Sequence, residues 1–215
     1  YKHMFELGLN VPDILFNSKI FSVPGYNEEG TNVKDFNFFL MSYVEGIAVD
    51  KKIMTVDDDE KLLWFNKISK IMAKVHSVKG QEYGFIDQYK KASFKTGTIE
   101  GLLDKLHNIT IKLLKENIGD EFAREVNIFM RDKIIPLSYE LKNSGYSPQI
   151  SLVLFDGSAG NMLVSDKNIQ IIDLVNLGYF EPLTDFCAHF FCMKDILILN
   201  YKGKSFWDHF LEGYQ

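Results

Sequence analysis

The stretch that decides the fold is LVLFDGSAGNMLVSDKNIQIIDLVNLGYFEPLTDF, which runs from Leu152 to Phe186. It places Asp156 just after an apolar segment that predicts a strand, and Asn161 at the start of the next predicted strand. Asp173 directly follows another short apolar segment of strand type. Three oxygen-bearing side chains therefore leave the ends of neighbouring strands, and we expect them to meet in one cleft.

These side chains are the set that phosphoryl transfer to a hydroxyl requires. One carboxylate orients the attacking hydroxyl and accepts its proton, while an amide oxygen and a second carboxylate hold Mg²⁺ against the phosphates. Magnesium prefers hard oxygen ligands and often takes only one or two of them from the protein. The alternative interpretation is that these Asp and Asn residues only form turns, which both residue types do routinely.

The order of these motifs resembles the aminoglycoside phosphotransferase family, a group of protein-kinase-like small-molecule kinases. Such kinases carry a catalytic loop of the form H-G-D-x-x-x-x-N, two short strands, an I-D segment and a G-x-x-x-P-x-x-D tail. This sequence has LFDGSAGN from Leu154 to Asn161, IID from Ile171 to Asp173, and GYFEPLTD from Gly178 to Asp185. The resemblance spans nearly the whole chain, but only the part from Leu152 to Asp185 is specific.

The resemblance implies a role for each matched residue. Asp156 would be the base or the carboxylate that orients the hydroxyl, and Asn161 and Asp173 would bind the metal. Asp185 would be structural and would hydrogen-bond the backbone of the catalytic loop. Upstream, FFLMSYVEG at 38–46 resembles the strand and hinge between two lobes, whose backbone reads the adenine edge. The residues that would line the nucleotide pocket are Met41, Ser42, Tyr43 and Val44.

Three departures from the family pattern bear on these roles. Leu154 and Phe155 replace the family's His and Gly before the catalytic Asp, so apolar contacts would pack the loop instead of a His side chain. The glycine-rich phosphate loop and the strand lysine with its helix-borne Glu are not visible. The sequence opens inside an apparent helix and stops at Gln215, short of the family's usual helical tail. We therefore expect this chain to be a fragment of a longer protein.

Apolar periodicity predicts the remaining elements. The tail of a helix should end at Gly8, and strand-like segments at 14–23 and 35–44 should pair as a hairpin. After Gly46 the period changes from two to 3.6, and helices are predicted from Thr55 or Asp57 to Gly80, from Thr98 to Asn117 and from Asp120 to Asn143. Pro136 should kink or break the last of these helices. Short strands are expected at 150–155, 161–164 and 169–172, and helices at 182–200 and 205–214.

This order of elements indicates an α+β architecture rather than a regular βαβ alternation. Combined with the resemblance, it predicts a protein-kinase-like fold in two parts. A mostly helical C-terminal lobe would cover residues 46–215 and carry the catalytic and metal-binding loops. A partial β-rich N-terminal lobe would cover residues 1–45, with the hinge at its end.

Composition disfavours several kinds of partner. Apolar residues make up 46% of the chain and charged residues 25%, with no run long enough for a membrane span and no signal peptide, so we expect a cytoplasmic protein. The net charge of -5 disfavours nucleic acid and anionic membranes, and it slightly favours a cationic acceptor. We expect Cys187 and Cys192 to be buried free thiols rather than a disulfide or metal site.

Two functional hypotheses follow from these observations. The first is an ATP- or GTP-dependent O-phosphotransferase that uses Mg²⁺ and acts on a hydroxylated small molecule. Its acceptor, an aminoglycoside, another antibiotic or an amino-alcohol, stays open, as does its oligomeric state; residues 81–98 and those after Asp185 are the candidates for acceptor specificity. The second is a catalytically inactive kinase-like module that binds a nucleotide or a protein partner, which Leu154 and the missing glycine-rich loop favour.

Overall fold

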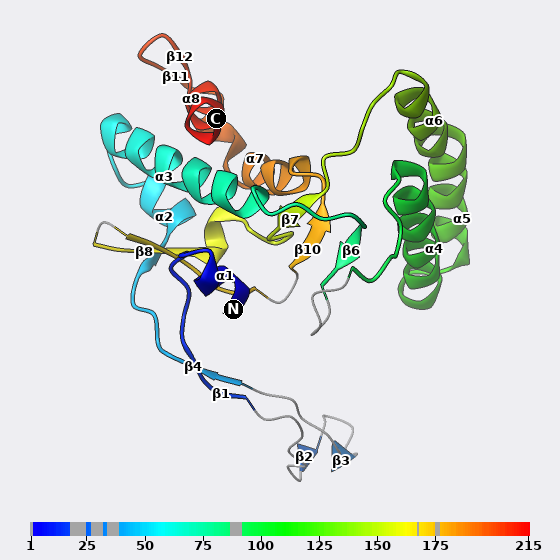
Figure 1. The fold of residues 1–215 in the computed structure, drawn as a ribbon, viewed down its shortest axis with the longest axis horizontal. Coiled ribbons are helices and arrows are strands. Elements are labelled where there is room, and N and C mark those ends of the chain that lie inside the picture. Colours follow the sequence, from blue (N-terminus) through cyan, green and yellow to red (C-terminus); the bar gives the residue numbers. More distant parts are fainter. Residues whose placement is uncertain are drawn as a thin grey trace.

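The computed structural model describes residues 2–17, 25–26, 32–33, 39–86, 92–166, 168–174 and 177–215. Figure 1 shows a body of helices and short strands, an arm that carries β1 to β4, and three helices, α4 to α6, standing to one side. None of the described helices combines the length and the apolar character that crossing a membrane requires.

The N-terminal segments form a short helix and two antiparallel pairs of strands. Helix α1 ends where the N–H of Gly8 donates to the carbonyl of Phe5, which confirms the predicted helix end. Strand β1 pairs with β4, and β2 pairs with β3, so the predicted hairpin is confirmed in its described residues. Positions 18–24 and 34–38 of that prediction lie outside the described residues. The elements are α1 (Lys2–Glu6), β1 (Ile14–Asn17), β2 (Gly25–Tyr26), β3 (Asn32–Val33) and β4 (Phe39–Met41).

Helix α3 (Asp58–His76) forms the spine of the main core. Its N-cap is Asp57, whose side chain accepts a hydrogen bond from the N–H of Glu60, and the acidic first turn is favoured by the helix dipole. Apolar residues at helical spacing bury one face of α3 against the core. Two short elements precede α3, namely β5 (Ile47–Ala48) and α2 (Val49–Ile53).

Helix α8 (Phe206–Tyr214) packs along α3. It begins with a capping box in which the Ser205 and Asp208 side chains each accept from the other residue's backbone N–H. Near its end, Gly213 lies so close to α3 that an added Cβ would overlap the hydroxyl of Ser69. The glycine therefore permits the close approach that brings Tyr214 to the end of α3.

Three helices form a separate unit inserted between α3 and β7. The predicted helix from Thr98 to Asn117 is present as α4 (Ile99–Asn117), and the side chain of Thr98 caps it. The predicted helix over 120–143 is present as α5 (Asp120–Phe129) and α6 (Ile135–Asn143), separated by a π-helical turn at 130–134. Pro136 lies in the first turn of α6, so the expected break takes the form of this π turn just before it.

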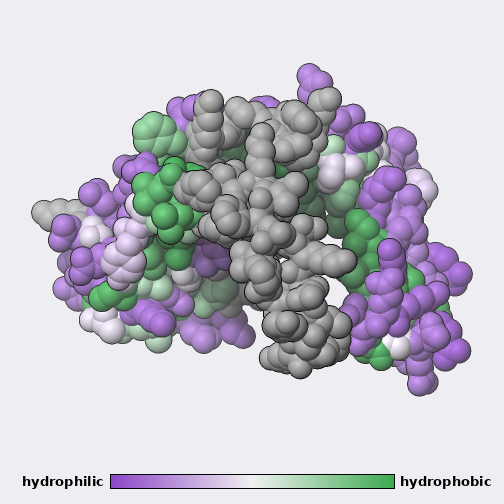
Figure 2. All heavy atoms as spheres, turned by 90° about the horizontal axis from the view of Figure 1, so that it is seen from below, coloured by the Kyte–Doolittle hydropathy of each residue, from purple (hydrophilic) through white to green (hydrophobic). Residues whose placement is uncertain are grey.

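The three-helix unit joins the body at one end. Leu102 of α4 packs into a small core with Tyr83 and Phe180, beside the antiparallel sheet of order β6-β10-β7. The carboxylate of Glu181 accepts from the Tyr83 hydroxyl at 2.8 Å and from the N–H of Gln149 at 3.2 Å. The Glu181 side chain thus bonds to one residue that precedes the unit in the sequence and to one that follows it. Farther out the helices expose apolar side chains, and Figure 2 shows such patches among hydrophilic ones on its right.

The remaining elements surround the predicted catalytic stretch. Strand β8 pairs with both β5 and β9, and α7 follows β10. All the predicted strands and helices of this region are present, with ends shifted by a few residues. The sequence does not predict β5, α2, β6, β10 or the β11–β12 hairpin. The elements are β6 (Gly84–Phe85), β7 (Ser151–Val153), β8 (Met162–Ser165), β9 (Asn168–Ile171), β10 (Gly178–Phe180), α7 (Leu183–Leu197), β11 (Asn200–Tyr201) and β12 (Lys204–Ser205). The α+β class is confirmed, and the division at residue 45 stays a prediction.

One expectation about α7 is wrong. Cys187 and Cys192 are free, but both are exposed rather than buried. Helix α7 is apolar nearly all round, so its sequence does not show which side faces the core. Among the described side chains of α7, the buried apolar ones are instead Met193, Ile196 and Leu197.

Candidate active site

The loop that carries Asp156 leaves β7 through a sharp turn. The N–H of Asp156 donates to the carbonyl of Leu154 at 2.7 Å, and Phe155 has a φ of 63°, a conformation that is rare for an aromatic residue. A short 3₁₀ turn at 159–161 then leads into β8. The exposed Asp156 side chain therefore stands on a tightly folded loop.

Asn161 joins the segments that carry the two predicted acidic residues. The side-chain Nδ2 of Asn161 donates to the backbone carbonyl of Asp156 at 2.7 Å. The backbone carbonyl of Asn161 accepts from the N–H of Ile172 at 2.9 Å. Because a backbone carbonyl only accepts, the amide orientation is fixed, and Oδ1 is the atom left to face a cation. The backbone of Asp156 and the residue preceding Asp173 thus meet at Asn161.

Asp173 follows β9 in an unusual backbone conformation. Its φ is 55°, and its side chain is exposed. Non-glycine residues in this region cost free energy, and they cluster at functional sites. Phe155, which precedes Asp156, and Asp173 itself both adopt this positive-φ conformation. The two loops that carry the predicted acidic site residues therefore share it.

Asp185 holds the backbone of the loop that carries Asp156. Its buried carboxylate accepts from the N–H of Leu154 and from the N–H of Phe155, each at 2.8 Å. The structural role that the resemblance implies for Asp185 is confirmed by these bonds. The carboxylate also lies 3.1 Å from Nε2 of His76, a buried residue at the end of α3 whose bond to Asp185 the sequence did not reveal.

Leu154 takes the place of the family's loop histidine, and it is buried. Its side chain covers Gly157, where an added Cβ would lie 2.6 Å from the Leu154 Cβ. The ring of Phe155 packs with those of Phe85 and Phe180, at centroid distances of 4.9 and 5.1 Å. The expectation that apolar contacts pack this loop is confirmed.

A second histidine lies behind the anchor. His189 is fully buried on α7, and neither ring nitrogen has a hydrogen-bond partner among the described residues. Burial lowers the pKa of His189 to about 4, because the charged ring would lose its hydration, and the nearby Asp185 only partly opposes this. The ring is therefore neutral at pH 7 and adds no charge beside Asp185.

The depressed pKa of His189 predicts a pH-dependent stability. Below the ordinary histidine pKa of 6.5, His189 of the unfolded chain binds a proton, whereas His189 of the folded chain does not bind one until about pH 4. The free energy of unfolding therefore decreases as the pH is lowered through this window. Between pH 7.5 and pH 5 this group should lower the free energy of unfolding by about 2 kcal/mol. Urea unfolding of the wild type and of His189→Leu at both pH values measures this contribution. If the free energy of unfolding fell by the same amount in both proteins between pH 7.5 and pH 5, the prediction would be wrong.

The side-chain oxygens of Asn161 and Asp173 are of the type that binds magnesium. Within the described part of the chain, no group of three or more His, Cys, Asp or Glu residues could hold a metal. Asn161 and Asp173 instead offer one amide oxygen and one carboxylate, which are hard ligands of the type Mg²⁺ takes alongside phosphate and water. The metal-binding roles of these two residues stay predictions.

The predicted hinge begins at Met41, the last residue of β4, and continues over 42–44 without regular secondary structure. Ser42 and Asp13 bind each other through two bonds of 2.9 Å, one of them accepted by the Ser42 hydroxyl. Tyr43 is 89% exposed. Met41 and Val44 are half-buried. Beyond the hinge, β5 pairs with β8, which joins this segment to the strand after Asn161.

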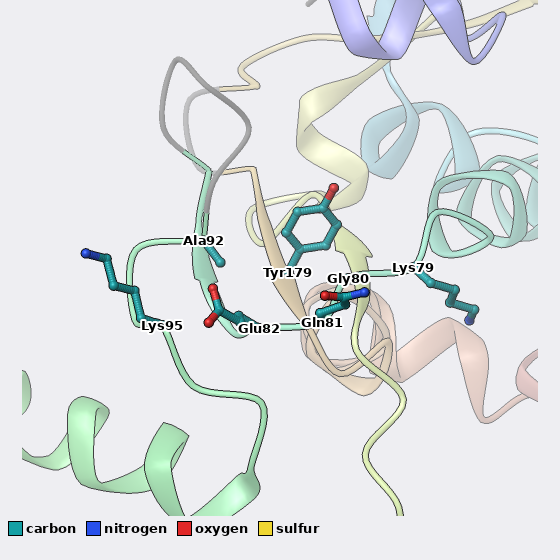
Figure 3. Close-up of a pocket in the computed structure, with 7 residues that line it drawn as sticks. All are labelled: Lys79, Gly80, Gln81, Glu82, Ala92, Lys95 and Tyr179. Carbon is teal, nitrogen blue, oxygen red and sulfur yellow. The ribbon is translucent and has the colours of Figure 1, made fainter.

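A cavity of about 520 Å³ lies at the opposite end of β7 from Asp156. At that end Lys79 donates to the Ser151 hydroxyl, and the N–H of Gly80 donates to the carbonyl of Ile150. Figure 3 shows the Lys79 and Lys95 side chains pointing away from each other. The cavity is thus separate from the predicted phosphoryl-transfer site, although four of its lining residues come from the 81–98 segment. Its lining residues are Lys79, Gly80, Gln81, Glu82, Ala92, Lys95 and Tyr179.

Comparison with known proteins gives structural matches only. No protein-family model and no curated protein matches the sequence. Similar solved structures include the gentamicin complex of APH(2'')-IIa, with a TM-score of 0.59 and 15% identity over 100% of this chain and 63% of that chain. A streptomycin-ATP complex of APH(2'')-IIa has the same TM-score and identity, over 100% and 64%. ADP-bound aminoglycoside phosphotransferase APH(2'')-Ib has a TM-score of 0.57 and 18% identity, again over 100% and 64%.

These likenesses establish the class of fold. The chain has the protein-kinase-like fold of small-molecule kinases of the aminoglycoside phosphotransferase type, as the sequence predicts. It spans about 63% of the length of the APH(2'')-IIa chain in the gentamicin complex. At identities of this size the fold is what the likeness shows.

Proposed function

We propose that the protein is an O-phosphotransferase that moves the γ-phosphoryl group of ATP or GTP onto a hydroxyl of a small molecule. The observation that carries the proposal is the position of Asn161, bonded both to the backbone of Asp156 and to the residue before Asp173. In a kinase fold these are the groups that orient the acceptor and hold the metal. The ATP and ADP complexes of structurally similar proteins add support.

Asp156 is the group we assign to the acceptor. Its exposed carboxylate would accept a hydrogen bond from the substrate hydroxyl, turn that oxygen toward the phosphorus and take its proton as the bond forms. The bonds from Asp185 hold the two residues before Asp156, so the carboxylate is placed before the substrates arrive. This preorganisation, rather than covalent chemistry, would supply most of the rate enhancement.

The remaining site residues would bind the nucleotide. Asn161 and Asp173 would hold Mg²⁺, which when bound neutralises phosphate charge. The backbone of the hinge would contact the base. The hinge residues assigned to this role are Met41, Ser42, Tyr43 and Val44.

The acceptor is proposed by class. The net charge of -5 favours a cationic amino-alcohol, and aminoglycosides belong to that class. Residues 81–98 are the segment we expect to tune the choice, although the cavity of Figure 3, to which four of them contribute, lies away from Asp156. Two free cysteines fit a reducing compartment, so a cytoplasmic location is part of the proposal.

A transfer assay tests the proposal. The full-length protein is incubated with Mg²⁺, γ-labelled ATP or GTP, and a panel of aminoglycosides and smaller amino-alcohols. Labelled acceptor should form with at least one compound and should disappear when EDTA removes the metal. Nucleotide binding without transfer to any acceptor would instead support the catalytically inactive module.

A further inference from the structure

A continuous chain of hydrogen bonds links the end of α8 to the catalytic loop. The Tyr214 hydroxyl lies 2.9 Å from Nδ1 of His76, and Nε2 of the same ring lies 3.1 Å from Asp185. Asp185 in turn accepts from the N–H groups of Leu154 and Phe155. The chain crosses α8, α3 and α7, and it ends one residue before Asp156.

The bond to Asp185 has a definite direction, because its carboxylate can only accept and Nε2 of His76 must donate to it. Nδ1 of the same ring lies within hydrogen-bond distance of the Tyr214 hydroxyl, and where Nδ1 carries no proton the hydroxyl donates to it. Burial and, less strongly, the charge of Asp185 raise the pKa of Tyr214, which keeps this donor protonated. His189, the other titratable group beside Asp185, is neutral at pH 7.

Packing holds the two rings in place. The Tyr214 ring meets that of Phe186 edge to face at a centroid distance of 4.8 Å, and Phe186 also contacts His76 at 5.5 Å. The Tyr214 and His76 rings lie 5.6 Å apart. The hydroxyl therefore cannot turn away from Nδ1 without disturbing this aromatic cluster.

We propose that Tyr214 is a positioning residue for the catalytic loop, acting through His76 and Asp185. Leu154 brings no polar side chain to the loop, so the two Asp185 bonds are what fixes the backbone before Asp156. The Tyr214 hydroxyl fixes the tautomer and tilt of His76, which orients the carboxylate. The consequence for catalysis rests on the proposed function, whereas the consequence for the loop backbone does not.

Tyr214→Phe tests the proposal because it keeps the ring and removes only the hydroxyl. The loss of one hydrogen bond should raise amide hydrogen exchange at Leu154 and Phe155 about tenfold relative to the rest of the core. It should lower kcat about tenfold and leave KM for nucleotide and acceptor unchanged. In a His76→Ala background, the same substitution should have no further effect on either quantity.

Ser205→Ala is the matched control. It removes the cap at the other end of α8, so it should weaken the same helix without changing kcat or the relative exchange of the two loop amides. Unchanged exchange at Leu154 and Phe155 in Tyr214→Phe would overturn the proposal, whatever happens to activity. If the wild-type protein transfers no phosphoryl group, the proposed function fails, and amide exchange alone still decides the role of Tyr214.

Discussion

Asp156→Asn should lower kcat for phosphoryl transfer by about 10²- to 10⁴-fold while the free energy of unfolding stays the same. The amide has the shape of the carboxylate, but it cannot accept the proton of the acceptor hydroxyl. Because the Asp156 side chain is exposed and the loop is held through backbone bonds, folding should not depend on it. Steady-state kinetics with the best acceptor and urea unfolding measure the two quantities.

A neighbouring aspartate supplies the control for this substitution. Asp166 is exposed in the turn after β8, and its φ of 51° is a conformation that Asn tolerates well. Asp166→Asn makes the same change of charge at the far end of the β8–β9 hairpin from Asn161 and Asp173. It should leave kcat within about twofold, because Asp166 is placed neither at the acceptor nor at the loop anchor. If Asp156→Asn retained full activity, its assigned role would have to be abandoned.

Asp185→Asn should lower the free energy of unfolding by about 3 kcal/mol. The NH₂ group of the asparagine would replace a carboxylate oxygen and would face a backbone N–H, so two donors would oppose each other. The native carboxylate accepts three bonds, from Leu154, Phe155 and His76. An amide has one accepting atom, so at least one buried donor loses its partner. Transfer activity should fall as well, because the loop before Asp156 loosens.

The control for Asp185→Asn lies on the same helix. Asp195 is exposed near the end of α7, so Asp195→Asn should change the free energy of unfolding by less than about 0.5 kcal/mol. Urea unfolding of the three proteins at pH 7 makes the comparison. An Asp185→Asn midpoint equal to that of the wild type would show that these bonds do not stabilise the fold.

The sequence predicts those parts of the fold that depend on local chemistry. Asp57, Thr98 and Ser205 each precede a periodic apolar run, and each caps a helix in the structure. The spacing from Asp156 to Asn161 spans one turn between strands, and the structure closes that turn with a bond between the two residues. Caps and tight turns involve neighbours in the chain, so their signals lie within a few residues.

Other features need the folded chain. His76 and Asp185 are hydrogen-bonded although they lie 109 residues apart in the sequence. The sequence around each residue contains no pattern that predicts the other as its partner. The exposure of Cys187 depends on how α7 rotates against the core, which an evenly apolar helix does not encode locally. The same holds for Glu181, whose partners Tyr83 and Gln149 come together only once the sheet has formed.

Glu181 bonds to Tyr83 and Gln149, which lie before and after the α4–α6 unit in the sequence. These bonds would allow the unit and the rest of the chain to change independently during evolution. Figure 1 shows the α4–α6 unit standing to one side of the body that carries β7, β8 and β10. Changes in the length or sequence of the α4–α6 unit could therefore leave the loop before Asp156 and its bonds to Asp185 intact. Under the proposed function, the choice of acceptor could then diverge while the residues assigned to phosphoryl transfer stay the same.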